Sequence, residues 1–130
     1  MKYLSDLDLK NKNIGLRVDL NVPIDNGEIL SHERLSAALP TILEILKHTR
    51  RLCIISHLGR PVEGNFSESL SLEPIKKWFE KRLNKSIPLI KNLEEIPDDH
   101  CFLENIRFFD GESSNDKKFA RMLANQFDIY

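Results

Sequence analysis

The amino-acid sequence predicts an α/β fold, a three-layer αβα Rossmann-like domain built around a parallel sheet. Short apolar runs bounded by turn residues alternate along the chain with longer stretches whose apolar residues recur at helical spacing, a pattern typical of βαβ units. Polar and basic residues directly follow several of the apolar runs. In a parallel sheet such residues gather at the carboxyl edge, where open α/β sheets bind their ligands.

The composition limits the class of protein. The chain has 130 residues, 41% hydrophobic and 30% charged, which is ordinary for one globular domain or part of one. The net charge of −1 gives no overall attraction to nucleic acid or to an anionic membrane. No apolar run approaches the ~20 residues of a membrane span and no signal peptide opens the chain, so we expect a cytoplasmic protein. Cys53 and Cys101 lie in apolar, strand-like runs, which predicts buried reduced thiols.

The first element is a predicted strand. Residues 1–12 are charged and irregular and are expected to lie on the surface. Over residues 14–22 apolar residues alternate with glycine or polar ones, which predicts a strand ended by Pro23 and a turn at residues 25–27. The polar residues of this strand are Arg17, Asp19 and Asn21. They would simply face solvent in a hairpin, whereas in a sheet covered on both faces they need a partner or a ligand.

A helix should follow, with Ser31 as its N-cap. Its apolar residues recur at helical spacing and are Leu35, Ala38, Leu39, Ile42, Leu43 and Leu46. Because this spacing continues beyond Pro40, we expect a kink near Leu39 rather than a break. Arg34 falls in the first turn, where a cation opposes the helix dipole, and this suggests a binding task.

The most informative stretch follows a predicted buried strand at residues 52–55. It is Ser56-His57-Leu58-Gly59-Arg60-Pro61. Strand, helix and strand form one βαβ unit, expected to be right-handed. Gly59 permits a tight turn, so His57 and Arg60 should face the crevice at the carboxyl edge. A loop is expected over residues 62–71.

The second half of the chain repeats the alternation. A helix is predicted over residues 72–83, capped by Ser71, and a strand over residues 87–90, where Pro88 indicates an edge position. The core face of this helix is Leu72, Ile75, Trp78, Phe79 and Leu83. After a turn at residues 97–99, the apolar run at residues 101–103 is a further strand, and Arg107 stands beyond its end.

The last residues predict one more helix, capped by Ser114 or Asn115. Its inward residues are Phe119, Met122 and Leu123. Residues 127–130 resemble the start of a strand with no turn after it, so we expect a truncated chain.

Nucleotide and metal motifs are missing from these residues. The five glycines form no G-x-G-x-x-G, and although Gly59 and Gly64 have the spacing of a phosphate loop, Asn65 and Phe66 stand where Lys and Ser or Thr are required. The four histidines show no metal-ligand spacing, and a structural or surface role is expected for all but His57. Ser56 beside His57 is not a nucleophile and base, because such partners meet in space rather than in sequence. We predict neither a nucleotide site nor a metal site in this chain.

What remains is a predicted anion site at one edge of the sheet. Its residues are Asp19, Asn21, Arg34, His57, Arg60 and Arg107. Guanidinium groups bind phosphate and carboxylate bidentately, so several of them with a histidine suit a small, doubly anionic molecule. A carboxylate and an amide can bond a hydroxyl of that molecule. Arginines scattered over the surface are the competing interpretation.

Four segments at these positions resemble the signature segments of phosphoglycerate kinase, in the family's order and approximate spacing. They are Arg17-Val18-Asp19-Leu20-Asn21-Val22-Pro23, Arg34 with Ala37-Ala38-Leu39-Pro40-Thr41-Ile42, Ser56-His57-Leu58-Gly59-Arg60-Pro61, and Leu103-Glu104-Asn105-Ile106-Arg107-Phe108. The resemblance extends from Leu4 to Tyr130.

The resemblance implies a function. Phosphoglycerate kinases are cytoplasmic, typically monomeric enzymes of glycolysis that transfer a phosphoryl group reversibly between ATP and the carboxylate of 3-phosphoglycerate, giving 1,3-bisphosphoglycerate, with Mg²⁺. Their N-terminal domain holds the glycerate and their C-terminal domain holds the nucleotide. By matching motif, Asp19 and Asn21 would contact the hydroxyl and carboxylate end. His57, Arg60 and Arg107 would hold the 3-phosphate, and Arg34 would reach the carboxylate and the transferring group as the catalytic residue.

Parts of the family pattern do not occur in residues 1–130. The next signature, an Asn-Asp-Ala-Phe run followed by Ala-His-Arg, is absent, as are the nucleotide domain and its Mg²⁺-supporting acidic residue. We therefore expect residues 1–130 to be a truncated N-terminal domain, inactive by itself and of doubtful stability because further strands would complete the sheet. The alternatives are a stand-alone anion-binding α/β module without catalysis and a degenerate scaffold product, against which the intact basic residues argue.

Overall fold

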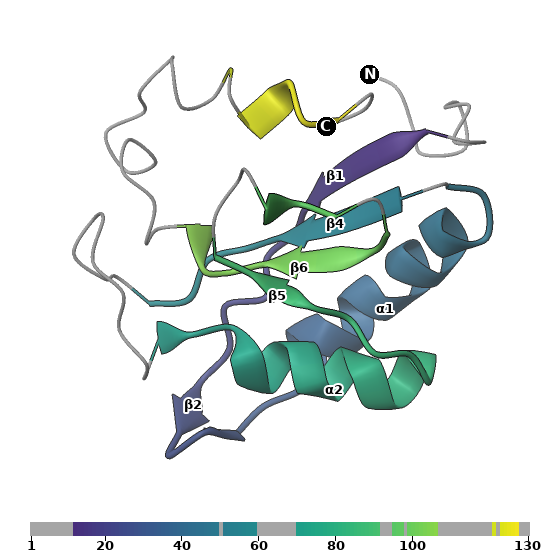
Figure 1. Ribbon diagram of the computed structural model, residues 1–130. Coiled ribbons are helices and arrows are strands. Elements are labelled where there is room, and N and C mark those ends of the chain that lie inside the picture. The colour runs from purple at the N-terminus through teal and green to yellow at the C-terminus, as the bar shows by residue number, and fades with distance from the viewer. Residues whose placement is uncertain are drawn as a thin grey trace, which may run out of the picture.

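The computed structural model describes residues 12–49, 51–59, 70–91, 95–97, 99–106, 121 and 123–127. Its centre is a four-stranded parallel sheet in the order β1 (Asn13–Arg17), β4 (Arg51–Ile55), β6 (Cys101–Leu103) and β5 (Leu89–Ile90) (Figure 1). The predicted α/β class and parallel sheet are confirmed. The strand β5, which directly follows Pro88, lies at an edge of the sheet, as expected. No helix in this part of the chain is long and apolar enough to cross a membrane.

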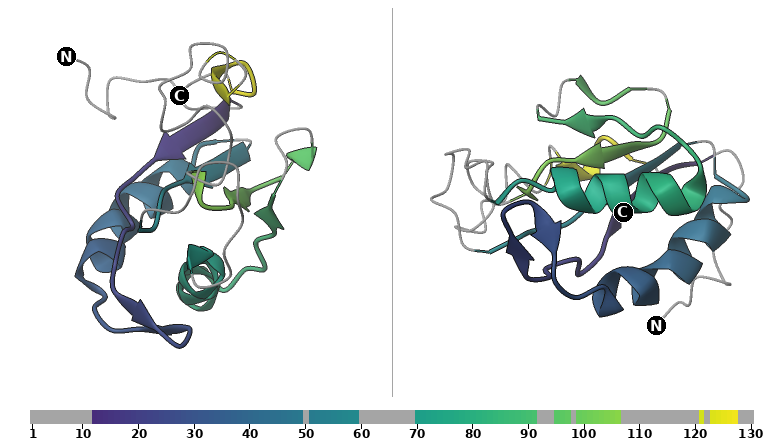
Figure 2. Two further views of the ribbon diagram at one scale, coloured as in Figure 1. Left: turned by 90° about the vertical axis from the view of Figure 1, so that its left-hand side faces the viewer. Right: turned by 90° about the horizontal axis from the view of Figure 1, so that it is seen from below.

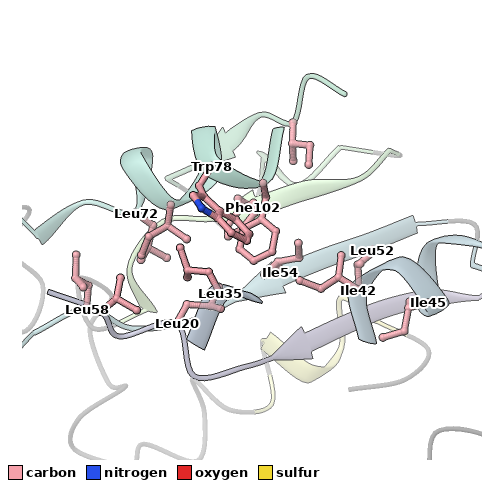
Figure 3. Close-up of a cluster of buried hydrophobic side chains, with 14 of the residues drawn as sticks. Leu20, Leu35, Ile42, Ile45, Leu52, Ile54, Leu58, Leu72, Trp78 and Phe102 are labelled. Atoms are coloured by element: carbon pink, nitrogen blue, oxygen red, sulfur yellow. The ribbon is translucent and has the colours of Figure 1, made fainter. Parts of the chain in front are cut away.

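Both long helices, α1 (Glu33–Leu46) and α2 (Glu73–Leu83), cover the same face of the sheet (Figures 1 and 2). Each connects a strand to one further along the sheet in the same direction, and crossovers of one hand then place their helices on one face. The main core fills the space between these two helices and the sheet (Figure 3). Its largest fully buried side chains include Leu35, Ile42, Leu52, Ile54, Ile75, Phe79 and Phe102.

The opposite face of the sheet carries a second, smaller core. Cys53, Ile55, Cys101 and Leu103 are buried there with Ile106 and Leu123, and Phe127 packs against them. A Cβ atom on Gly15 would lie 2.5 Å from the ring of Phe127, so this close approach requires glycine in β1. Residues 123–127 thus form part of a third layer, and the inward position predicted for Leu123 is confirmed.

The two cysteines are buried and form no disulfide, as predicted. Cys53 and Cys101 are register partners on β4 and β6. The hydrogen bond between the two thiols and burial raise the pKa of Cys53 well above its usual value, so this thiol stays protonated.

The first strand is shorter than the alternation predicts. It ends at Arg17 rather than Val22. The Val18 N–H still donates to the Ile55 carbonyl (3.0 Å), but the Leu20 N–H donates to the hydroxyl of Ser56 (3.0 Å), so strand pairing stops there. The expected turn closes a small antiparallel ribbon of β2 (Ile24–Asp25) and β3 (Glu28–Ile29). Its two turn residues have φ of 49° and 77°, which suits Asn-Gly.

Both helices start one residue later than predicted. Ser31 is not the N-cap of α1, because the helix begins at Glu33 and His32 takes the cap position without a side-chain bond. Pro40 lies inside an uninterrupted helix, so the expectation that it does not break the helix is confirmed, and the kink near Leu39 stays a prediction. At α2 the cap position belongs to Leu72, but the Ser71 hydroxyl still accepts the N–H of Glu73 (3.2 Å). The predictions for residues 107–120 and for Met122 lie outside the described residues.

His100 links the start of β6 to β4 and provides a pH test. Its Nδ1 accepts the N–H of Leu52 (3.0 Å), and burial, with a smaller contribution from Lys85, lowers its pKa below 6.5 despite the opposing charge of Asp99. The unfolded chain therefore binds a proton more readily, so the free energy of unfolding should fall as pH decreases through the window just below 6.5.

We expect His100→Gln to flatten this part of the pH profile, measured by urea denaturation between about pH 5 and pH 7.5. His48→Gln removes an exposed histidine that follows the C-terminal end of α1 and contacts Glu44, and it serves as the control. An unchanged slope in His100→Gln would assign the acid sensitivity to other groups.

Candidate anion-binding site

The loops that follow β1, β4 and β6 lie at one edge of the sheet, because the three strands are parallel. The first carries Asp19 and Asn21 and the second carries His57. Arg34 is the second residue of α1. The structure describes these predicted site residues. Arg60 and Arg107, which were predicted with them, lie outside the described residues.

Asp19, Asn21 and Arg34 form one hydrogen-bonded cluster. Nη1 of Arg34 donates to Oδ1 of Asp19 (3.1 Å) and to the backbone carbonyl of Asn21 (2.8 Å). The Asn21 N–H donates to the same carboxylate oxygen (3.1 Å). The sequence predicted this grouping at the edge of the sheet, and the carboxylate explains how a cation is accommodated in the first helical turn.

The ion pair of this cluster is accessible to solvent. The side chains of Arg34 and Asp19 are 54% and 61% exposed. Exposed pairs of this kind add less than about 1 kcal/mol to stability. The pair therefore orients the guanidinium rather than holding the fold together.

Asn21 also connects the first loop to the second. Its Oδ1 accepts the N–H of Gly59 (3.1 Å). Gly59 has φ of +61°, and a Cβ atom there would lie 2.7 Å from the side chain of Leu70, so the tight turn predicted at this glycine is confirmed and no other residue fits without strain. His57 precedes this turn by two residues and is half-buried.

A buried polar layer lies beneath these loops. Ser56 is fully buried, its hydroxyl accepts the N–H of Leu20 (3.0 Å), and its carbonyl accepts the N–H of Ile106 (2.9 Å). One residue thus ties together the exits of β1, β4 and β6.

Glu104 anchors the start of α2 to the exit of β6. Its carboxylate accepts the Ser71 hydroxyl (2.6 Å) and the N–H groups of Leu72 and Asn105 (2.8 Å each), and the side chain is 2% exposed. A carboxylate against the first residues of a helix is favoured by the helix dipole. Sequence reasoning assigned no role to Glu104 or Asn105 and considered Ser56 only as a nucleophile. The sequence feature that could have indicated their roles is that these polar residues directly follow apolar strands.

Among the described residues, no group of three His, Cys, Asp or Glu side chains converges in a way that could hold a metal ion. The chemistry of the site is that of cationic and hydrogen-bond donors and acceptors at the edge of a parallel sheet. It can bind an anion and stabilise charge that develops on it.

Comparison with known proteins shows which family the chain resembles in sequence. A sequence model of phosphoglycerate kinase matches residues 4–130. The phosphoglycerate kinases of Coxiella burnetii and Legionella pneumophila (strain Lens) are each 41% identical over 98% of this chain, which covers 34% and 33% of them.

Solved structures agree with the sequence comparison. The Coxiella burnetii enzyme aligns with a TM-score of 0.86 at 41% identity over 94% of this chain and 32% of that one. The Pyrococcus horikoshii enzyme gives 0.80 at 26% identity over 99% of this chain and 36% of that one. The chain spans about a third of the length of the relatives it matches. It belongs to the phosphoglycerate kinase family.

Proposed function

We propose that this chain is the N-terminal, 3-phosphoglycerate-binding domain of a cytoplasmic, monomeric phosphoglycerate kinase. The reaction is reversible phosphoryl transfer between ATP and the carboxylate of 3-phosphoglycerate, which yields 1,3-bisphosphoglycerate. The observation that carries the proposal is the Arg34 guanidinium held at the carboxyl edge by Asp19 and Asn21, in a chain of this family. The partners are small molecules, with no role for nucleic acid or membrane.

Each site residue has a proposed role in holding the glycerate. Asp19 and Asn21 bond the hydroxyl and the carboxylate end, because an acceptor and an amide together recognise a hydroxyl. His57, Arg60 and Arg107 hold the 3-phosphate, for which guanidinium groups are suited. Arg34 reaches the carboxylate.

Arg34 also acts during the transfer itself. A carboxylate oxygen of the glycerate forms a bond to the transferred phosphorus as the bond from phosphorus to the ADP oxygen breaks. Such reactions depend mainly on positioning and on stabilisation of the spread negative charge. The exposed guanidinium exchanges Asp19 for the substrate oxygens and carries out both tasks.

The nucleotide and its Mg²⁺ belong to a different domain in this proposal. When bound, Mg²⁺ with ATP or ADP neutralises phosphate charge. Among the described residues, no cluster of three His, Cys, Asp or Glu side chains offers a metal site. We assign both to a C-terminal nucleotide-binding domain outside residues 1–130, so these residues alone should be inactive.

A chimera tests the proposal directly. Residues 1–130 replace the matching third of the Coxiella burnetii enzyme, and ATP formation from 1,3-bisphosphoglycerate and ADP is measured. We expect turnover from the chimera, and binding of 3-phosphoglycerate without turnover from the 130-residue chain. In that chain Arg60→Ala should weaken binding by about tenfold or more. Lys47→Ala, which removes an exposed cation at the other end of α1, should not.

Two results would contradict the proposal. A chimera that unfolds cooperatively and binds ADP but shows no turnover, together with a chain that does not bind 3-phosphoglycerate, would remove the assigned function. Binding by the chain with an inactive, folded chimera would instead favour an anion-binding module without catalysis.

A further inference from the structure

We propose that Asn105 is a positioning residue for the anion site, and that affinity for the glycerate depends on the hydrogen bonds of its buried amide. The inference rests on the proposed function, because it identifies what sets the geometry of the same site. Asn105 is the second residue after β6 and is 0% exposed.

The amide of Asn105 joins two distant parts of the backbone. Its Nδ2 donates to the carbonyl of Leu58 (2.7 Å) and to the carbonyl of Leu70 (2.9 Å), residues that lie 47 and 35 positions away in the sequence. An amide has two N–H bonds, so one side chain satisfies both carbonyls. A buried carbonyl without a hydrogen-bond donor costs folding free energy. The two bonds from the amide therefore hold the backbone at both positions in register with the end of β6.

Leu58 transmits this restraint to the site. It lies between His57 and Gly59, is 4% exposed, and packs at the same end of the main core as Leu20 and Leu35 (Figure 3). Its carbonyl is thus fixed by the amide while its side chain is fixed by the core.

The next links in this chain of contacts lead to Arg34. The Gly59 N–H donates to Oδ1 of Asn21, and the carbonyl of Asn21 accepts from Arg34. A shift of residue 58 therefore displaces the donor that orients Asn21, and with it one of the two acceptors that hold the guanidinium.

The remaining contacts at the exit of β6 do not depend on the amide. The strand pairs with β4 and β5, and the Ile106 N–H is held by the carbonyl of Ser56. Loss of the amide should therefore loosen residues 57–59 while it leaves the sheet intact. A purely structural residue would instead lower stability without a local effect at the site.

Two variants of the 130-residue chain test the role. Asn105→Ala removes both donors, and Asn105→Leu keeps a similar volume but offers no donor. The control, Ile75→Val, trims a fully buried residue of α2 that has no hydrogen-bonding group in its side chain. The dissociation constant of 3-phosphoglycerate and the hydrogen exchange of the Gly59 amide are measured below all thermal transitions. If the chain shows no cooperative transition, both measurements use the chimera.

We expect both Asn105 variants to bind about tenfold more weakly and to exchange the Gly59 amide about tenfold faster, with exchange in β4 little changed. Ile75→Val should change neither quantity. Unchanged affinity in either Asn105 variant, or an equal loss in Ile75→Val, would overturn the inference. If neither the unmodified chain nor the chimera binds the glycerate, the proposed function fails, and the exchange of Gly59 decides alone: protection retained in both variants overturns the positioning role.

Discussion

Arg34→Ala should lower the turnover of the chimera by about a thousandfold, because a fixed arginine on a transferring phosphoryl group contributes at least that much. The affinity for 3-phosphoglycerate should fall much less, by under about tenfold, because Arg34 meets the ligand in exchange for Asp19. A contact already made in the resting state adds little to ground-state binding when it is replaced by a similar one. Its value appears where charge spreads over the phosphoryl oxygens.

The measurement separates the two effects. Turnover is taken at saturating substrates, and the dissociation constant of 3-phosphoglycerate is measured on the same preparation. Arg34→Lys keeps the charge but not the planar fork, and should recover only part of the turnover. Lys47→Ala, at the opposite end of the same helix, should match the parent protein. An affinity loss as large as the loss of turnover would make Arg34 a binding residue only.

Sequence reasoning could group Asp19, Asn21 and Arg34 because two local rules apply to them. Alternation placed the first two on one side of an extended segment, and the carboxyl-edge rule placed the helix start beside them. The structure adds the bonds that join them. The residues that these bonds join are therefore brought together by the same sequence pattern that defines the strand and the helix.

Ser56, Glu104 and Asn105 could not be assigned in that way. Their side chains make hydrogen bonds to residues 32 to 47 positions away, so no local periodicity records them. Only the strand order β1-β4-β6-β5 brings their partners together. A polar residue directly after a buried strand is compatible with a solvated loop until the order of the strands is known.

The predicted boundaries of the first strand and of α1 were wrong for a related reason. Alternation continues to Val22 because Leu20 and Val22 remain buried, although Val18 makes the last backbone hydrogen bond to β4. Alternating burial of side chains and backbone pairing between strands are separate properties. The sequence pattern indicates only the alternating burial. At α1 the cap preference of Ser31 was overridden, and the helix starts at Glu33.

Phe102→Ala should remove about 3–5 kcal/mol from the free energy of unfolding of the 130-residue chain. Phe102 is 0% exposed in β6, which pairs with β4 on one side and β5 on the other. Its ring lies 5.7 Å from that of Phe79, centroid to centroid. Because strands flank it and α2 covers it, the surrounding structure has little freedom to collapse into the cavity.

A loss of this size approaches the whole stability of a small domain, so the variant should be largely unfolded at room temperature. Urea denaturation followed by circular dichroism measures it, with Leu43→Ala as the control, since that side chain of α1 is 43% exposed and should cost less than about 1 kcal/mol. Phe102→Leu, which leaves a smaller cavity, should fall between the two and keep the value measurable. If Phe102→Ala were no more costly than Leu43→Ala, the core between the sheet and α2 would not be what holds the carboxyl edge in place, and the loops that carry Asp19, Asn21 and His57 would need another support.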